Sequence, residues 1–312
     1  MASNLILIEV IVSVKIKTYF CNDKSIAMIS KIQMAKELEG IIKNGIREDV
    51  GEGDHSSLAC IPKDAKGKAK LLVKEEGIIA GVEFAKMIFQ EVDPGLQIET
   101  FIADGDTVDV GDIVFFVTGS SQSILKAERL VLNAMQRMSA IATKTNKFVE
   151  LLKGTKTRIL DTRKTTPGIR AIEKWAVTIG GGVNHRFALY DMMMIKDNHI
   201  DFSGGISNAI QKTKTYLADN NKNLDIIVEA RSLAEVNEIL EQGGVKRILL
   251  DNFDYKTTKE AVAIIGDKCQ SESSGGITEA TIAEYAKCGV DFISVGALTH
   301  SVLNFDLSLK AI

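Results

Sequence analysis

Six short apolar segments in the second half of the chain each end in a charged residue or run into a glycine loop. They cover residues 159–160, 193–195, 226–228, 248–250, the segment before Ser274 and 292–295, and the first four run into Asp161, Lys196, Glu229 and Asp251. Successive ends lie about 20 to 35 residues apart, which leaves room for one helix in each interval. This pattern predicts a parallel α/β barrel of irregular, TIM-like form.

The carboxyl ends of the strands in such a barrel open at one mouth, so we expect the end residues to face a common site. A doubly wound open sheet produces a similar alternation of strands and helices, but it concentrates functional residues at one switch point. Polar residues at the end of nearly every segment favour the barrel over the open sheet.

The first half of the chain has a different, α+β pattern. Residues 34–46 and 82–90 predict helices, and short β-like runs cover 70–74, 97–101 and 112–117. Apolar residues recur at helical spacing from 122 to 153, which predicts one long helix or two abutting ones ended by Gly154. We therefore divide the chain into an extension (1–33), an α+β domain (34–153) and the barrel (154–312).

Composition excludes several classes of protein. The 312 residues are 45% apolar and 25% charged, with a formal net charge of −3, which is typical of one or two folded domains and not of a disordered chain. A net negative charge argues against broad binding to nucleic acid. The apolar run near the N-terminus is too short for a membrane span and lacks the flanks of a signal peptide, so an extended reading frame or a loosely attached strand is the simpler interpretation.

The cysteines indicate a reducing compartment. Cys21, Cys60, Cys269 and Cys288 lie far apart, and none has the spacing of a zinc site or a redox pair. We expect free thiols and a cytoplasmic location.

The segment 158–186 concentrates positive charge. It holds six Lys or Arg residues (158, 163, 164, 170, 174 and 186) and two acids (161 and 173), so 6 − 2 gives +4. Arg163 and Lys164 follow the first barrel strand directly after Thr162, and planar guanidinium groups match carboxylates while lysine suits phosphate. Arg170 and Lys174 are expected on the surface or in salt bridges. The local excess predicts an anionic ligand in a pocket.

Further candidate residues follow from glycines and acids near the strand ends. Three glycines at 180–182 allow close backbone approach and deliver His185 and Arg186 together. Glu229 and Asp251 are acceptors that suit sugar hydroxyls or a hydrated Mg²⁺, or they balance the charge of Lys196 and Arg163. The glycine loops after the last two strands suit a phosphate and consist of Ser274, Gly275 and Gly276, then Val295, Gly296 and Ala297.

Taken together, these motifs resemble the quinolinate phosphoribosyltransferase family, also called nicotinate-nucleotide pyrophosphorylase, from about residue 41 to 309. The resemblance runs through Glu128-Arg129, Asn133, Gln136-Arg137, Asp161-Thr162-Arg163-Lys164-Thr165-Thr166-Pro167-Gly168, residues 180–186, Ile195-Lys196-Asp197-Asn198-His199, residues 250–252, 274–277 and Ser294-Val295-Gly296-Ala297-Leu298-Thr299-His300. It departs from the family at Ala230 and at 271–273, where neither change removes a charge-bearing residue of the motifs.

The resemblance implies an α/β barrel behind an open-faced α+β sandwich, and an enzyme that converts quinolinate and phosphoribosyl pyrophosphate, with Mg²⁺, to nicotinate mononucleotide, pyrophosphate and CO₂. It assigns Arg129, Arg163, His185 and Arg186 to the quinolinate carboxylates, and Lys164 and Lys196 to phosphates. It also assigns Glu229 and Asp251 to ribose and metal, and the glycine loops to the 5′-phosphate. Lys164, Lys196, Glu229 and Asp251 would be catalytic, and Arg129 would reach the site from the partner subunit of a homodimer.

Two other interpretations remain. A group of pyrophosphorylases found with molybdenum transport shares the Thr-Arg-Lys loop and the His-Arg pair, but residues 189–192 and 196–199 favour the quinolinate enzyme. A non-catalytic phosphate-binding barrel is the alternative outside enzymes, because a fold alone does not determine activity. Its simplest mark would be loss of Arg163, Lys196 or Glu229, and all three are present.

Overall fold

The structure, a computed structural model, describes residues 30–312. Its first element is helix α2 (Lys31–Val50). The Ser30 side chain caps this helix by accepting a hydrogen bond from the Gln33 amide. The helix predicted over 34–46 is confirmed and is longer at both ends. The predictions for the N-terminal extension fall almost entirely on residues outside the described ones.

An antiparallel four-stranded sheet forms the N-terminal domain. Its strand order is β12 (Leu307–Ala311), β1 (Lys66–Val73), β5 (Ile113–Ser120) and β3 (Gln97–Thr100). The three predicted β-like runs are therefore confirmed. The last strand of the chain pairs with β1, from Ala69 opposite Ala311 to Val73 opposite Leu307. The predicted domain boundaries stay a prediction, but this strand returns from the C-terminal end to the N-terminal sheet.

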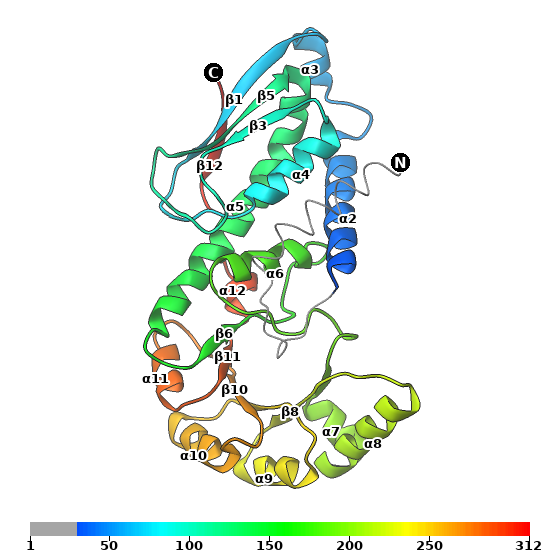
Figure 1. Ribbon diagram of the computed structural model, residues 1–312, viewed down its shortest axis with the longest axis vertical. Helices are drawn as coiled ribbons and strands as arrows, with labels where there is room; N and C mark the ends of the chain where they lie inside the picture. Colours follow the sequence, from blue (N-terminus) through cyan, green and yellow to red (C-terminus); the bar gives the residue numbers. More distant parts are fainter. Residues whose placement is uncertain (1–29) are drawn as a thin grey trace.

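Helices α4 (Val82–Val92) and α5 (Ser121–Leu151) lie against this sheet (Figure 1). The region from 122 to 153 forms one helix, where the sequence allowed one or two, and Gly154 follows it in the left-handed conformation with φ of 81°. Figure 1 shows α5 running from the N-terminal sheet down to the second half of the molecule. The remaining elements of this domain are α3 (His55–Cys60), β2 (Gly77–Ile78) and β4 (Thr107–Val108).

The second half contains six parallel strands in the order β7-β8-β9-β10-β11-β6. Figure 1 shows them following an arc, with helices on its outer side. The strands are β6 (Arg158–Leu160), β7 (Met193–Ile195), β8 (Ile226–Ala230), β9 (Arg247–Asp251), β10 (Gln270–Ser274) and β11 (Phe292–Ser294), and the helices are α6 (Arg170–Ile179), α7 (Asp197–Ser203), α8 (Ile206–Asp219), α9 (Leu233–Gln242), α10 (Tyr255–Ile265), α11 (Ile282–Lys287) and α12 (Ala297–His300).

This strand order is the cyclic order of a barrel that is open between β6 and β7. A doubly wound sheet would reverse its order at a switch point, and no reversal occurs among these six strands. Val183 extends the β6 edge through a single parallel bridge to Leu160. The predicted parallel α/β architecture and strand polarity are confirmed, although the hydrogen-bonded ring of the described strands is not closed.

Close packing between α5 and the segment after α6 explains the triple glycine. A Cβ atom on Gly180 would lie 2.4 Å from the carbonyl oxygen of Ala142, and one on Gly182 would lie 2.7 Å from the Thr145 methyl group. Val183 follows this contact and pairs with Leu160 of β6, so residues 184–186 begin at the unpaired edge of β6. No helix in the described part of the chain combines the length and the apolarity that crossing a bilayer requires.

We predict opposite effects for two glycine-to-alanine changes. Gly180→Ala should lower the free energy of unfolding by about 2 kcal/mol or more, because the methyl group meets the α5 backbone, which cannot move like a side chain. Gly40→Ala, inside α2 with no neighbour within 4 Å, should raise it by about 0.5–1 kcal/mol. Urea denaturation of both variants measures the difference. Equal effects would show that the α5 contact does not constrain residue 180.

Candidate active site

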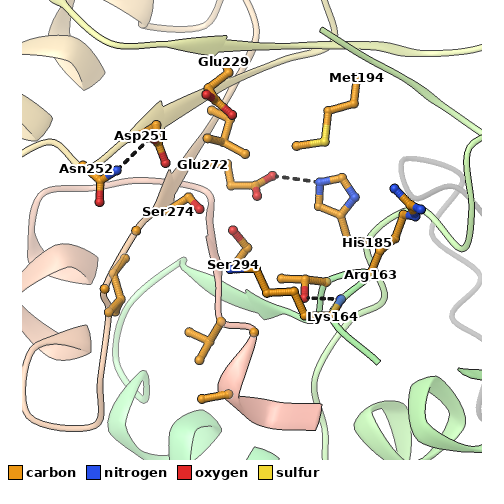
Figure 2. A pocket seen from close by; sticks show the side chains of 18 of the residues that line it. Arg163, Lys164, His185, Met194, Glu229, Asp251, Asn252, Glu272, Ser274 and Ser294 are labelled. Carbon is orange, nitrogen blue, oxygen red and sulfur yellow. Dashed lines mark hydrogen bonds and ion pairs between the residues drawn. The ribbon is translucent and has the colours of Figure 1, made fainter. Parts of the chain in front are cut away.

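A cavity of about 750 Å³ opens at the carboxyl ends of the parallel strands (Figure 2). All the predicted substrate-binding residues except Arg129 line it, so the structure brings together residues from both glycine loops and every barrel strand. These are Thr162, Arg163, Lys164, His185, Arg186, Lys196, Glu229, Asp251, Ser274, Gly275, Gly276, Val295, Gly296 and Ala297. What each residue binds stays a prediction.

Two guanidinium groups face the cavity without a carboxylate partner among the pairs seen in residues 30–312. The Arg163 Nε atom is buried and has no hydrogen-bond partner. Arg186 is buried and donates to the Met192 carbonyl at 3.4 Å. Burial lowers the pKa of Arg186, and the charge of Arg163 lowers it further, while Asp191 opposes the shift. Two desolvated cations that repel each other favour the binding of an anion.

A fully buried ion pair holds the segment that carries His185. Asp161 Oδ1 accepts hydrogen bonds from Lys174 Nζ at 2.6 Å and from the His185 amide at 2.7 Å. Its Oδ2 accepts one from Asn184 Nδ2 at 2.8 Å, and Lys174 also donates to the His185 carbonyl. Burial raises the pKa of Asp161, and its donors oppose that rise. Lys174 is therefore in a salt bridge, as the sequence allowed, and it lies in the interior.

The second acid of the basic segment is also an internal partner. Glu173 is buried and accepts hydrogen bonds from Arg137 Nε at 2.9 Å and from the Thr166 amide at 3.0 Å. Arg137 belongs to α5, so this contact ties the long helix to the basic loop. Arg170 donates to Thr165 Oγ1 and to the Phe187 carbonyl. Of the basic residues in the segment 158–186, Arg163, Lys164 and Arg186 therefore supply the positive charge at the cavity.

The side chains of Lys164 and His300 both lie close to the backbone of Gly296. Thr299 Oγ1 donates to the Lys164 carbonyl at 2.9 Å, and a Cβ atom on Gly296 would lie 2.9 Å from Lys164 Cδ and 3.1 Å from His300 Nε2. A side chain at 296 would push both groups apart. His300 lines the cavity and was not among the predicted site residues, although it ends the Ser294–His300 motif.

The two acids lie across the cavity from the arginine and lysine of the basic loop, as Figure 2 shows for Glu229 and Asp251 opposite Arg163 and Lys164. Lys196 Nζ lies 3.6 Å from Glu229 Oε2. Burial raises the pKa of Glu229, Lys196 lowers it, and Asp251 raises it. Residues 30–312 contain no group of three or more His, Cys, Asp or Glu side chains arranged for a metal ion. Two carboxylates fit Mg²⁺ only where water and substrate oxygens complete its coordination.

Asn252 supports both Asp251 and the first glycine loop. Its Nδ2 donates to Asp251 Oδ2 at 2.8 Å, and its backbone has a φ of 56°, which is uncommon for a residue other than glycine. A Cβ atom on Gly275 would lie 2.1 Å from Asn252 Oδ1, and Gly275 itself has a φ of 97°. The loop can pack this closely only because residue 275 has no side chain.

The residues predicted for the site include no large apolar side chain of the β7 or β9 strand, because the prediction rested on the polar residues at the strand ends. Met194 and Leu249 line it from β7 and β9. Leu249 lies two residues before Asp251, so strand alternation places both side chains on the same face. That alternation was the signal that could have identified it.

Arg129 does not line the cavity of its own chain. It lies on α5 and is exposed. The structure of one chain therefore leaves this predicted substrate contact apart from the others.

Comparisons with known proteins agree along most of the chain. Residues 54–139 match "Quinolinate phosphoribosyl transferase, N-terminal domain" and residues 141–310 match the corresponding C-terminal domain. The chain is 45% identical to quinolinate phosphoribosyltransferase (decarboxylating) 2a, mitochondrial, of Nicotiana tabacum, over 88% of this chain and 82% of that protein. It is 37% identical to the probable nicotinate-nucleotide pyrophosphorylase (carboxylating) of Bacillus subtilis, covering 88% and 93%.

Solved structures show the same similarity. NadC from Streptococcus pyogenes superposes with a TM-score of 0.82 at 35% identity, covering 91% of this chain and 99% of that one. The nicotinate-nucleotide pyrophosphorylase from Francisella tularensis has a TM-score of 0.81 at 37% identity, covering 89% and 96%.

We predict that two Lys–Asp pairs with similar N–O distances contribute differently to stability, because one is buried and the other is exposed. Lys174→Met should lower the free energy of unfolding by about 3–5 kcal/mol, because it leaves Asp161 charged and unpaired in the interior. Lys156→Met, which removes the exposed Lys156 Nζ–Asp291 pair at 2.8 Å, should cost less than about 1 kcal/mol. Chemical denaturation of both variants provides the comparison. Similar small losses would contradict a structural role for the buried pair.

Proposed function

The chain belongs to the quinolinate phosphoribosyltransferase family, and from this membership we propose how its cavity carries out the family reaction. The chain is a pentosyltransferase, a decarboxylating nicotinate-nucleotide pyrophosphorylase of de novo NAD biosynthesis. Quinolinate and phosphoribosyl pyrophosphate give nicotinate mononucleotide, pyrophosphate and CO₂. The observation that supports this most directly is the pair of guanidinium groups of Arg163 and Arg186, which line the cavity without a carboxylate partner among residues 30–312.

Quinolinate presents two carboxylates on a flat ring. Arg163 and Arg186 supply the positive charge that these carboxylates need, and guanidinium forks bind carboxylates through two parallel hydrogen bonds. Met194 and Leu249 provide apolar surface for the ring. The cavity therefore has the chemical features of a binding site for a small aromatic dianion.

Phosphoribosyl pyrophosphate occupies the other part of the cavity in this proposal. Lys164 and Lys196 bind phosphate oxygens, and the open backbone of 274–276 and 295–297 receives the 5′-phosphate. Glu229 and Asp251 accept hydrogen bonds from the ribose hydroxyls and would hold Mg²⁺ through water or directly. A bound Mg²⁺ would neutralise charge on the pyrophosphate leaving group.

The reaction requires positioning and charge compensation from the protein. The lone pair of the ring nitrogen forms a bond to the anomeric carbon of ribose as the bond from that carbon to pyrophosphate breaks. The quaternised ring then takes up the electron pair of the C2–carboxylate bond, CO₂ leaves, and C2 accepts a proton. No covalent enzyme intermediate is needed, so Lys164 and Lys196 act by stabilising the developing negative charge of pyrophosphate.

Arg129 acts in the site of a partner subunit in our proposal. Its exposed position on α5, apart from the cavity of its own chain, supports a contribution across a homodimer interface. Such a contribution would add a third guanidinium to the quinolinate end of each cavity. We also propose a reducing compartment, the cytoplasm, because Cys60, Cys269 and Cys288 are free thiols.

The activity can be tested by release of labelled CO₂. Purified protein with quinolinate labelled at the C2 carboxylate should release label only when phosphoribosyl pyrophosphate and Mg²⁺ are both present. Nicotinate labelled at its carboxylate is the matched control, because it lacks the group that leaves. Folded protein that releases no label under these conditions would refute the proposed function.

The contribution of Arg129 can be tested by subunit mixing. Arg129→Ala and Arg163→Ala homodimers should each be inactive, while an exchanged mixture should recover up to about a quarter of wild-type activity, since half of the dimers carry one intact site. Mixing Arg163→Ala with Lys196→Ala is the control and should restore nothing, because both changes lie in the same cavity. Absence of recovery despite demonstrated exchange would exclude action across the interface.

A further inference from the structure

At the wall of the cavity, three polar side chains form a chain of contacts, of which His185 and Glu272 line the cavity and Arg247 lies behind Glu272. Arg247 starts β9, Glu272 lies in the middle of β10, and His185 lies at the cavity. Glu272 is the register partner of Leu249, and Arg247 precedes Leu249 by two residues. The side chains of Arg247, Leu249 and Glu272 therefore point to the same, inner face of the sheet. Their exposed fractions are 2%, 0% and 6% for Arg247, Glu272 and His185. A charge pair with so little exposure has no solvent to screen it.

The Glu272 carboxylate is held from below by Arg247. Arg247 Nη1 donates to Glu272 Oε2 at 2.9 Å, while its Nε and Nη2 donate to Gln270 Oε1 at 3.2 and 3.1 Å. The guanidinium carbon also lies 4.0 Å from the centre of the Phe292 ring. The cation balances the carboxylate, so the interior presents no net negative charge beneath the site proposed for a dianion.

The same carboxylate oxygen faces the imidazole of His185. Glu272 Oε2 lies 3.5 Å from His185 Nε2, the pair marked in Figure 2. Burial raises the pKa of Glu272, and the contacts with His185 and Arg247 oppose that rise and hold the pKa below its usual range. Glu272 is therefore an ionised acceptor at neutral pH.

The other ring nitrogen fixes the tautomer of His185. Its Nδ1 lies 2.7 Å from the backbone nitrogen of Arg186, and a backbone N–H can only donate. Nδ1 is therefore the acceptor without a proton, and the ring hydrogen is on Nε2, directed toward Glu272. The ring is neutral in this arrangement, so the positive charge for the substrate carboxylates comes from the arginines.

The Nε2 hydrogen is oriented toward Glu272 but makes no regular hydrogen bond. Neither His185 Nε2 nor Glu272 Oε1 has a hydrogen-bond partner that meets normal geometry, although both atoms are buried. Buried polar atoms normally find a partner, so an incoming ligand oxygen would relieve the shortfall at Nε2. Because the N–H lies in the plane of the ring and the ring is held at Nδ1, a ligand oxygen at the ring edge would share this hydrogen with Glu272 Oε2, 3.5 Å away, in a three-centre hydrogen bond.

We propose that Glu272, backed by Arg247, is a positioning residue that holds His185 as its neutral Nε2–H tautomer, ready to donate to a quinolinate carboxylate. This inference rests on the proposed function for the identity of the ligand. Glu272 itself does not touch the reacting atoms. The nearby charged groups Asp161 and Lys174 bind the His185 backbone and not its ring, so they fix where the ring is attached and leave its tautomer to Arg186 and Glu272.

The main test replaces the whole charge pair. In Arg247→Met/Glu272→Leu, no buried charge is left alone, so the protein should fold. The KM for quinolinate should rise by about tenfold or more, while the KM for phosphoribosyl pyrophosphate changes by less than about twofold. Glu272→Gln keeps an oxygen for Arg247 and His185, so its KM for quinolinate should stay within about threefold of wild type. Gln270→Leu removes bonds to Arg247 only and should leave both constants unchanged.

Nitrogen-15 NMR of the ligand-free protein tests the tautomer separately from activity. The chain has four histidines, and His185→Asn identifies the relevant signals. Wild type should show a neutral Nε2–H imidazole at residue 185, and the double variant should show a mixture of the two neutral tautomers. A folded double variant with wild-type spectra and wild-type KM for quinolinate would overturn the proposal. Failure of the wild type to release CO₂ would refute the proposed function, while the spectra would still decide the role of Glu272.

Discussion

The buried Asp161–Lys174 pair is the interaction on which the rest of the site depends. Asp161 ends the first barrel strand, and its two oxygens hold the Lys174 ammonium, the Asn184 amide and the His185 backbone. One carboxylate thereby attaches the segment of His185 and Arg186 to β6. Because the strands are not hydrogen-bonded between β6 and β7, this attachment stands where a closed barrel would have a strand pair.

With that segment fixed, charges of opposite sign occupy different parts of the cavity. Figure 2 shows Arg163 on one side of the cavity and Glu229 and Asp251 on the other, and in residues 30–312 Arg163 has no carboxylate partner. The acids that would otherwise neutralise the cations, Asp161 and Glu173, are occupied by Lys174 and by Arg137. The free protein thus keeps its positive charge for a ligand.

The strand ends could be predicted from sequence because parallel strands bring their carboxyl ends to one side of a sheet. Arg163, Lys196, Glu229 and Asp251 follow from that rule alone, and they line one cavity. The burial of Lys174 could not be predicted, since a lysine in a basic segment shows its partner only after folding. Likewise, Glu272 was not among the predicted site residues, whereas the pairing of β10 with β9 places it beside Leu249 and at the wall of the cavity. Arg129 is the predicted substrate contact that the single chain does not bring to the cavity.

The central claim is that Arg163 and Arg186, whose guanidinium groups have no carboxylate partner among residues 30–312, bind the two carboxylates of one ring. Titration calorimetry of the protein with quinolinate and with nicotinate tests it most directly, because the two ligands differ by one carboxylate. A charge-assisted hydrogen bond contributes about 1.5–3 kcal/mol, so quinolinate should bind about 10- to 100-fold more tightly than nicotinate. Equal affinities would show that the cavity does not recognise the second carboxylate and would contradict the account.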